Sequence, residues 1–476
     1  MAFFLPFVLL NLAHHLLLLC PPALPRFSQP PSTRPTAAPT DRQPAPARPP
    51  AAPLPRASRR AARPAHVAQP RRRARRRRLI PGHDARDPPA LQRHNADIAA
   101  RSIGDSTRAC GHCESSVLCL PPRRKWRALR RLGAADLFSP QRLAATRPLR
   151  QEAVAGLVRR VSDHAARGAP VDVGRAAHAA ALGLLSRTMF SADLHPATAS
   201  EMSDVVDEAS VLAAGPNVSD FLPALAAADL QGVRRRMARL VRRMYAIIDE
   251  QIERRVHSRA AGEARRNDLL DVMLDKDLFT GGETTSHTIE CARGELLQAP
   301  NTMRKLQDEL KSVVGTKQQI DETDISKLPY LQAVVKETLR LHPPVPLPPY
   351  EAEATVEVQG YTIPKGTKVL INIWAINRCA DAWIEPNKFM PERFLGSEVN
   401  FMGRDFQLIP FGAGRRICLG LPLAYRMVHL MLGSLLIRFR WTLPTEVEKN
   451  GVNMRERFGL ALSLVVPLRA VPEEIH

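Results

Sequence analysis

The sequence predicts a mainly α protein with small β-sheets, an α+β fold class, and three observations support this prediction. Between residues 140 and 275, apolar side chains recur at spacings of three and four, which is the period of one face of an α-helix. Between residues 354 and 373, apolar side chains alternate instead, as they do along a β-strand. The chain has 476 residues, enough to bury a large core. We therefore expect one large helical domain over residues 91–476.

Residues 1–20 are apolar, and no Lys or Arg occurs before Arg26. They are nearly long enough to cross a bilayer, although Pro6 and Asn11 weaken the segment. Because positive charge lies only downstream, the positive-inside rule places the rest of the chain in the cytosol. We predict a membrane signal anchor over residues 1–20, with a cleaved signal peptide as the alternative.

Residues 21–90 are rich in Pro, Ala and Arg and contain no Glu or Lys. They offer too few β-branched residues for a sheet or a core, so we predict a disordered Pro/Arg-rich linker. Residues 1–90 hold 16 Arg and 3 Asp, which places +13 of the net charge of +21 there. The run from Arg71 to Arg78 has the composition of a nucleic-acid-binding or anionic-lipid-binding segment. The simpler interpretation is a solvated basic linker.

Trp126 and Arg130 lie four residues apart on a predicted helix and share one face. An indole N–H and a guanidinium both donate to carboxylates, so the pair can meet an acidic group. The alternative is a Trp that packs under a surface Arg. Several other arginines of this region point outward and form a basic patch suited to an acidic redox partner: Arg123, Arg124, Arg127 and Arg131.

The segment 277–286 opens a predicted helix that ends before Pro300. Gly281 and Gly282 each cost a helix about 1 kcal/mol, so we infer that a ligand needs the room they leave. Glu283 and Thr284, an acid followed by an alcohol, can relay protons to bound dioxygen and are the candidate catalytic residues. A simple turn or capping box is the alternative.

The sequence predicts three further elements of secondary structure. A helix is predicted from Asn301 or Thr302 to Val314, and a hairpin-like sheet is predicted over residues 354–373, interrupted at Pro364. The amphipathic pattern from residue 424 to Phe439 predicts a long core helix.

Glu337 and Arg340 lie three apart on one face of a helix predicted from Leu331 to His342. Apolar neighbours on both sides indicate that this ion pair is partly buried, where it needs further polar partners. A surface ion pair would contribute little to stability.

The stretch from Phe411 to Gly420 carries the clearest chemistry. Three glycines in this loop leave room for a flat ligand and free amide N–H groups to point at the Cys418 sulfur, which lowers its pKa and holds it as a thiolate. Arg416 is placed to meet an anionic group on the same ligand. This combination predicts a haem with Cys418 as its axial ligand. The alternative is a structural cysteine in a glycine-rich turn.

The pattern Phe411-x-x-Gly414-x-Arg416-x-Cys418-x-Gly420 resembles the haem loop of the cytochrome P-450 monooxygenases. Over residues 91–470 the chain resembles the plant microsomal members, and its C-terminal third resembles the geraniol 8-hydroxylase-like group. The resemblance implies the cytochrome P-450 fold, with an incomplete N-terminal sheet, and haem b as cofactor. Trp126 and Arg130 would hold a haem propionate.

The resemblance also implies the partners and the reaction. NADPH-cytochrome P-450 reductase would deliver electrons, and one atom of O2 would enter an apolar small molecule such as a terpenoid. The enzyme would sit on the endoplasmic reticulum membrane through its N-terminal anchor, with the catalytic domain facing the cytosol. No nucleic acid is expected as a partner.

The resemblance completes the ion pair and also shows departures. Arg393, in Pro-Glu-Arg-Phe, would join Glu337 and Arg340 in a structural clamp around the haem loop. The family's oxygen motif has one spacer residue that is missing before Glu283, and Tyr350 stands where the family has a propionate-binding His.

Three alternatives stay open. The chain would be a haem-binding but catalytically defective relative if the missing segments matter. It would be a basic nucleic-acid-binding protein if the arginine run is its functional part, or a membrane-tethered interaction protein that needs no haem.

Overall fold

The computed structural model describes residues 78–79, 96–108, 113, 116–261, 263, 283–315, 317, 319–358 and 360–475. The chain divides into two compact units, residues 1–62 and 63–476, and every described residue lies in the second unit. The predicted anchor over residues 1–20, nearly all of the predicted linker, and Gly281 and Gly282 lie outside the described residues. Among the helices that the structure describes, none is both long enough and apolar enough to cross a membrane.

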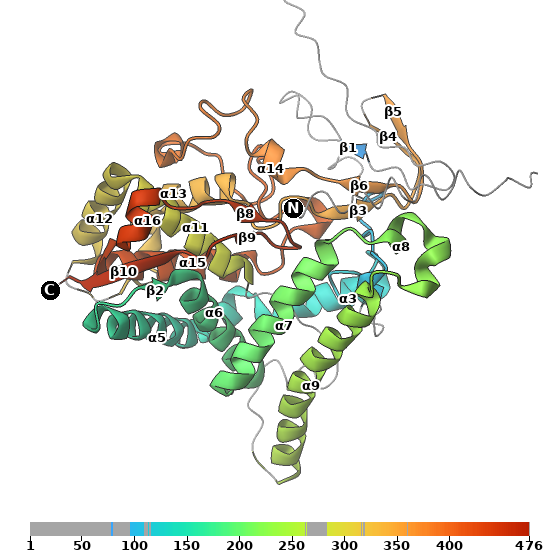
Figure 1. The fold of residues 1–476 in the computed structure, drawn as a ribbon, viewed down its shortest axis with the longest axis horizontal. Helices are drawn as coiled ribbons and strands as arrows, with labels where there is room; N and C mark the ends of the chain where they lie inside the picture. The colour runs from blue at the N-terminus through green and yellow to red at the C-terminus, as the bar shows by residue number, and fades with distance from the viewer. Residues whose placement is uncertain are drawn as a thin grey trace, which may run out of the picture. The chain divides into compact units, whose positions relative to one another are not determined.

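Helices make up most of the described fold (Figure 1). The α-helices are α3 (Arg124–Leu132), α4 (Pro140–Ala145), α5 (Arg147–Ala166), α6 (Val173–Phe190), α7 (Pro196–Ala214), α8 (Val218–Phe221), α9 (Val233–Ala260), α11 (Glu283–Gln298), α12 (Pro300–Val314), α13 (Pro329–Leu341), α14 (Ile373–Ile376), α15 (Leu421–Arg438) and α16 (Thr445–Asn450). Shorter helical turns are η2 (Gly133–Leu137), η3 (Pro223–Ala228), η4 (Ile325–Lys327), η5 (Pro391–Phe394) and η6 (Gly414–Arg416).

Within the described residues, the strands form four small sheets, two with three strands and two with two. They are β1 (Arg78–Leu79), β2 (Val171–Asp172), β3 (Pro349–Glu351), β4 (Val356–Val358), β5 (Tyr361–Ile363), β6 (Lys368–Leu370), β7 (Phe439–Thr442), β8 (Glu456–Arg457), β9 (Ser463–Leu464) and β10 (Arg469–Glu474). The three-stranded sheets have the orders β1-β6-β3 and β2-β10-β7, and only β1 and β6 pair in parallel.

Helix α11 lies at the centre of the main core. It packs against α6, α12, α13 and α15, and its residues Ile289, Cys291 and Leu296 are fully buried. Helix α15 begins three residues after Cys418. The contact between α11 and α15 therefore connects the helix of the predicted oxygen motif to the loop of the predicted cofactor ligand.

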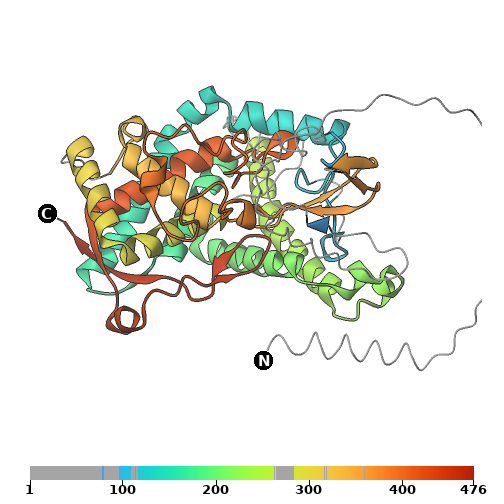
Figure 2. The same ribbon diagram turned by 90° about the horizontal axis from the view of Figure 1, so that it is seen from above.

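The remaining elements cover this core. Strand β10 pairs with both β2 and β7. It runs beside α5, and in both views the red strand lies near the teal helix (Figures 1 and 2). Helices α7 and α9 pack against each other. The buried residues of α5, Val154, Leu157 and Val161, have the three-and-four spacing that predicted a helix here.

Several predicted boundaries shift by a few residues. Helix α12 begins at Pro300 with Ala299 as its N-cap, so the predicted caps Asn301 and Thr302 are wrong. Proline suits the first helical position because its missing N–H would have no partner there. Phe439 belongs to β7 rather than to the preceding helix, and Ile373 starts α14 rather than continuing a strand.

The prediction that residues 21–90 build no sheet is wrong at two residues. Strand β1 pairs in parallel with β6, with Arg78 opposite Val369 and Leu79 opposite Leu370. Composition did not reveal this strand, because a sheet edge offers backbone hydrogen bonds to a short segment whatever its side chains.

Glu290 joins α11 to two other parts of the core. Its Oε1 atom accepts a hydrogen bond of 2.9 Å from the Leu468 amide. A Cβ atom at Gly174 of α6 would lie 2.8 Å from the Glu290 carboxyl carbon, so glycine is what allows α6 this close. Burial raises the pKa of Glu290 to about 7, against the lowering effect of the Leu468 amide.

This raised pKa predicts a pH-dependent stability. The folded protein favours the protonated form of Glu290. The contribution of this residue to stability is therefore complete below its ordinary pKa of 4.5 and is lost as the pH rises through about 7. In Glu290→Gln the side chain stays neutral. Between pH 5 and pH 8 we expect the unfolding free energy of wild type to fall, relative to that of Glu290→Gln, by up to about 3 kcal/mol. Denaturant titration of both proteins measures this difference.

The matched control is Glu152→Gln, because Glu152 is an exposed carboxylate on α5. An identical pH profile for Glu290→Gln and wild type would contradict the prediction.

Candidate cofactor site around Cys418

The loop before α15, residues 411–420, turns sharply, and at two of its positions the backbone has a conformation that only glycine adopts without strain. Gly412 has φ +72° and Gly414 has φ +63°, both in the left-handed region. The Cys418 amide donates to the Phe411 carbonyl over 2.9 Å and closes the loop. Gly420 differs from our expectation, because its φ is −81° and it acts as the N-cap of α15.

The expectation that the loop lowers the pKa of Cys418 is wrong, because burial outweighs the donors around its sulfur. The residue is solvent-accessible, yet the protein atoms around it displace enough water to raise the thiol's pKa above the ordinary value. The Gly420 amide, the Arg130 charge and the Leu421 amide act in the opposite direction. Gly420 thus contributes a donor rather than conformational freedom. An accessible sulfur with amide donors is suited to binding a metal.

Arg416 is buried beside this loop and bonds only backbone oxygens among the described residues. Its Nε donates to Ala99 O over 2.6 Å, its Nη1 to Val117 O over 3.2 Å and its Nη2 to Leu120 O over 2.5 Å. Burial lowers the pKa of Arg416 to about 10, and the neighbouring positive charges act in the same direction. A guanidinium in this position stabilises an anion brought beside it.

Trp126 and Arg130 also lie at this place. The Trp126 ring has the Arg416 guanidinium 4.7 Å from its centre and the Arg130 guanidinium at 5.2 Å. The Trp126 indole donates to Val117 O over 3.1 Å, and Arg130 Nη1 donates to Ile417 O over 3.0 Å. The structure therefore places Trp126 and Arg130 beside Arg416. It also shows the packing of Trp against Arg that was the alternative interpretation of this pair.

Arg101 is a residue that the sequence analysis missed. An antiparallel bridge between Ala100 and Glu351 holds its segment against β3. Its guanidinium lies 4.5 Å from the centre of the Tyr350 ring, and its Nη1 donates to Pro349 O. Its Nε is buried and has no hydrogen-bond partner within the described residues. No motif surrounds Arg101 in the sequence, so only the β-bridge reveals its position.

The residues around Cys418 thus fit an anionic metal-bearing group. Three guanidinium groups, from Arg101, Arg130 and Arg416, lie close enough to affect one another, and that of Arg130 also acts on the Cys418 thiol. One of them keeps an unpartnered buried nitrogen that an acidic ligand group would satisfy. The donor set matches a flat macrocycle whose metal binds sulfur and whose acid groups meet the arginines.

The two candidate catalytic residues begin α11. Glu283 is its first residue, and only its backbone is described. Thr284 is half-buried, and its carbonyl accepts from the Thr288 hydroxyl over 2.8 Å. Among the described residues, no hydrogen bond joins Thr284 to Cys418.

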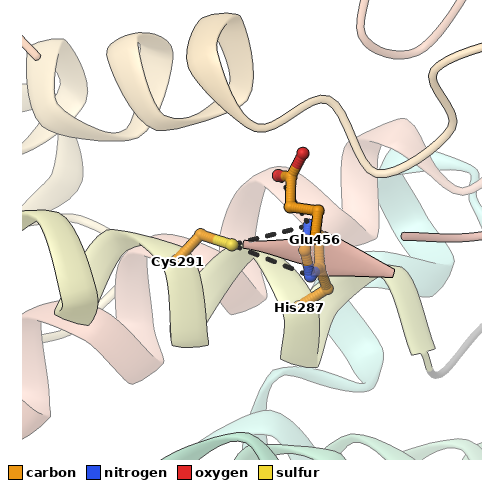
Figure 3. Close-up of side chains that lie close together, drawn as sticks. All are labelled: His287, Cys291 and Glu456. Atoms are coloured by element: carbon orange, nitrogen blue, oxygen red, sulfur yellow. Dashed lines mark hydrogen bonds and ion pairs between the residues drawn. The ribbon is translucent and has the colours of Figure 1, made fainter. Parts of the chain in front are cut away.

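Along the same face of α11 lies a polar cluster that we did not predict (Figure 3). His287 and Cys291 project from successive turns of α11, and the Glu456 carboxylate of β8 lies beside them. His342 and Glu295 continue the network. His287 and Cys291 read as ordinary helix residues in the sequence, and Glu456 is more than 160 positions away from both of them.

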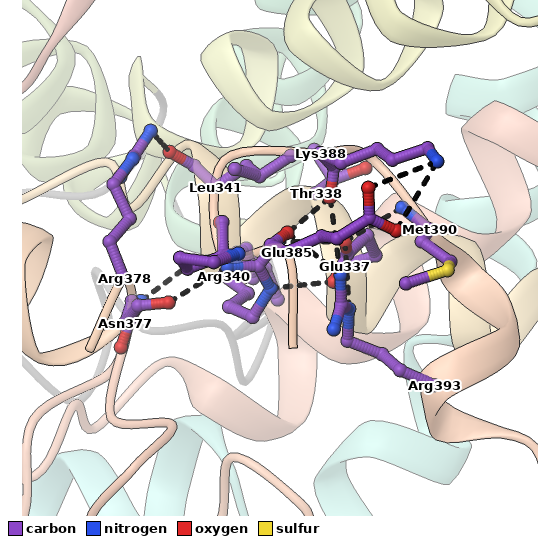
Figure 4. Close-up of polar contacts among 12 residues, drawn as sticks. Glu337, Thr338, Arg340, Leu341, Asn377, Arg378, Glu385, Lys388, Met390 and Arg393 are labelled. Carbon is purple, nitrogen blue, oxygen red and sulfur yellow. Dashed lines mark hydrogen bonds and ion pairs between the residues drawn. The ribbon is translucent and has the colours of Figure 1, made fainter. Parts of the chain in front are cut away.

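Glu337, Arg340 and Arg393 come together as the sequence analysis expected (Figure 4). Arg340 donates to both carboxylate oxygens of Glu337 over 2.7 and 2.8 Å, and Arg393 Nε adds a bond of 3.1 Å. The Met390 amide donates to the same carboxylate over 2.8 Å. Glu337 and Arg340 are fully buried.

The second set of Arg340 bonds holds a loop in place. Its Nη1 donates to the carbonyls of Asn377 and Pro386, and its Nη2 donates to that of Lys388. Helix α13 is thereby connected to residues 377–394, which precede the Cys418 loop.

Comparison with known proteins agrees with this fold and site. Residues 89–465 match the family described as Cytochrome P450, and the chain belongs to this family. It is 43% identical to geraniol 8-hydroxylase from Catharanthus roseus, over 81% of this chain and 83% of that relative. It is 42% identical to geraniol 8-hydroxylase from Swertia mussotii, over 80% and 81%.

A third relative, cytochrome P450 76C2 from Arabidopsis thaliana, is 41% identical over 80% of each chain. The chain is therefore a cytochrome P450 monooxygenase, and the family uses a haem iron with a cysteine thiolate ligand.

The arginines around Cys418 predict how tightly haem is held. Each charged hydrogen bond contributes about 1.5–3 kcal/mol, so Arg101→Ala and Arg130→Ala should each weaken haem binding about tenfold or more. The measurement is the rate of haem transfer to a scavenging apoprotein. Arg127→Ala, an exposed arginine of the same helix, is the control. A loss of haem as large in Arg127→Ala as in Arg130→Ala would contradict this assignment.

The buried ion pair predicts a large loss of stability. Glu337→Gln leaves two guanidinium groups without their carboxylate in the interior, which costs about 3–5 kcal/mol of unfolding free energy. The Glu385–Lys388 pair has the same spacing of three but is exposed. Glu385→Gln should therefore change stability by less than about 1 kcal/mol. Equal effects in denaturant titrations of the two variants would refute the clamp.

Proposed function

We propose that this monooxygenase inserts one oxygen atom from O2 into an apolar small molecule, a terpenoid or similar secondary metabolite, with haem b held by Cys418. The accessible Cys418 thiol with the Arg130 guanidinium beside it, in a cluster with Arg101 and Arg416, is the observation that supports this proposal most directly. Relatives named geraniol 8-hydroxylase support the substrate class, because geraniol is a small, mostly apolar terpenoid alcohol.

The residues of the loop would divide the work of binding haem. Cys418 would be the axial ligand, oriented by the amides of Gly420 and Leu421. Gly414 and Phe411 would shape the turn that presents it. Bound haem supplies the activation of O2 and the oxygen-atom transfer, with the thiolate donating electron density.

The arginines and Trp126 would orient the acid groups of the haem. Arg101, Arg130 and Arg416 carry the positive charge for these groups. Trp126, whose indole N–H is donated to Val117 O, would hold the Arg130 and Arg416 guanidinium groups against its ring. Their present bonds to backbone carbonyls leave further N–H donors available on Arg130, because a guanidinium carries five.

Proton delivery is assigned to the beginning of α11. The Thr284 hydroxyl would hold a proton at Oγ1 for the reacting oxygen, and the Glu283 carboxyl would replenish it. The family likeness of the Glu-Thr pair supports these roles.

Electrons would come from NADPH through NADPH-cytochrome P-450 reductase. Arg123, Arg124, Arg127 and Arg131 are exposed around α3, on the helix that also carries Trp126 and Arg130, and would attract an acidic reductase surface. We place the enzyme on the endoplasmic reticulum membrane, anchored by residues 1–20, with its catalytic domain in the cytosol.

The experiment uses the full chain, co-expressed with a plant reductase in yeast membranes. Reduced membranes treated with carbon monoxide should show the red-shifted Soret band of a thiolate-ligated carbonyl, and geraniol with NADPH should give a hydroxylated product. Cys418→Ser should lose both signals. Cys379→Ser, at another free cysteine, should keep them.

The two readouts separate the alternatives. A Soret band with NADPH oxidation but no oxygenated product from geraniol or related terpenoids would identify a catalytically defective relative. A shifted Soret band retained in Cys418→Ser would overturn the ligand assignment.

A further inference from the structure

The haem-dependent reaction uses none of the side chains in the cluster of His287, Cys291 and Glu456. These residues offer an imidazole nitrogen, a sulfur and a carboxylate oxygen, and the three ligand atoms lie within 4.8 Å of one another. The Cys291 sulfur lies 3.5 Å from His287 Nε2 and 3.7 Å from Nδ1, and His287 Nε2 lies 3.8 Å from Glu456 Oε1. Donor atoms this far apart can surround one small ion at ordinary bond lengths.

The contacts inside the cluster are poor as hydrogen bonds. The sulfur is nearly equidistant from both ring nitrogens, so neither N–H bond is aimed at it. Within the described residues, both ring nitrogens of His287 find only this sulfur within hydrogen-bonding range. His287 is 4% exposed and Cys291 is fully buried. Buried polar groups with such weak partners are destabilising unless something further binds them.

The charges of the three side chains suit a divalent ion at this place. A divalent ion with one thiolate, one carboxylate and one neutral imidazole forms a set of zero net charge, which suits a buried site.

A second layer of residues orients the carboxylate. Glu456 Oε1 lies 2.7 Å from His342 Nδ1, and His342 Nε2 lies 2.8 Å from Glu295 Oε1. The His342 ring therefore lies between the carboxylates of Glu295 and Glu456. Hydrogen bonds of this kind fix the ligand carboxylate, as they do around structural metal ions.

We propose that His287, Cys291 and Glu456 bind a Zn²⁺ ion that ties α11 to β8, with a water molecule as fourth ligand. A mixed nitrogen, sulfur and oxygen set favours zinc over magnesium or calcium, which prefer oxygen alone. Binding breaks the Cys291 S–H bond, forms a Zn–S bond and releases one proton to solvent, with no change of oxidation state. The site uses none of the residues assigned to the haem, and it would fix the helix that carries Thr284 against the segment around Glu456.

The first test is metal analysis of the full-length haem-loaded protein, purified after expression in zinc-supplemented medium. We expect about one zinc per chain, independent of the iron content. X-ray absorption at the zinc edge should show one sulfur at about 2.3 Å and nitrogen or oxygen ligands at about 2.0–2.1 Å. Zinc with no sulfur neighbour, or no zinc above background, would overturn the proposal.

The second test compares cysteine variants. Cys291→Ala and His287→Leu should each lose the zinc, whereas Cys379→Ala, a free cysteine outside the cluster, should retain it. Zinc with its sulfur ligand retained in Cys291→Ala would refute the assignment. If Cys291→Ala does not fold, the absorption spectrum of the wild-type protein decides alone. Because neither readout is oxygenation, a failure here is distinguishable from a failure of the proposed function.

Discussion

The arrangement of the C-terminal half depends on the hydrogen bonds that the buried Glu337 carboxylate accepts. This carboxylate accepts from Arg340, Arg393 and the Met390 amide, and Arg340 in turn binds carbonyls of the loop over residues 377–388. A buried charge of this kind is tolerated only when every partner is present. The loop that leads to Cys418 is therefore anchored before the cysteine is reached. These polar bonds add to the packing of Trp383 and Phe394 in the main core.

Charge also organises the region on the other side of Cys418. Arg101, Arg130 and Arg416 come from three distant parts of the chain, and burial and mutual repulsion lower the pKa of Arg416. The backbone carbonyls of residues 99, 117 and 120 stabilise Arg416 in this position. A protein interior concentrates positive charge in this way where an anionic group is to be held. This concentration of charge supports our proposal that the acid groups of the haem lie here.

Helix α11 lies between these parts of the fold and carries buried polar residues on more than one of its faces. Thr284 stands at its beginning, near the predicted oxygen motif, and His287 and Cys291 follow on the same face. Glu290, on another part of the helix, receives the Leu468 amide and lies against Gly174. A central helix with this many buried polar groups is positioned by specific pairings as well as by packing.

The sequence by itself determined the helical class, the loop of Cys418, and the association of Glu337, Arg340 and Arg393, because each depends on local spacing or on a short motif. The two residues of β1, the position of Arg101 and the cluster of His287, Cys291 and Glu456 could not be predicted in the same way. Strand pairing of β1 with β6 and of Ala100 with Glu351 joins segments more than 200 residues apart. Only the tertiary structure decided these contacts, since they depend on how separate elements meet and not on the pattern within any one of them.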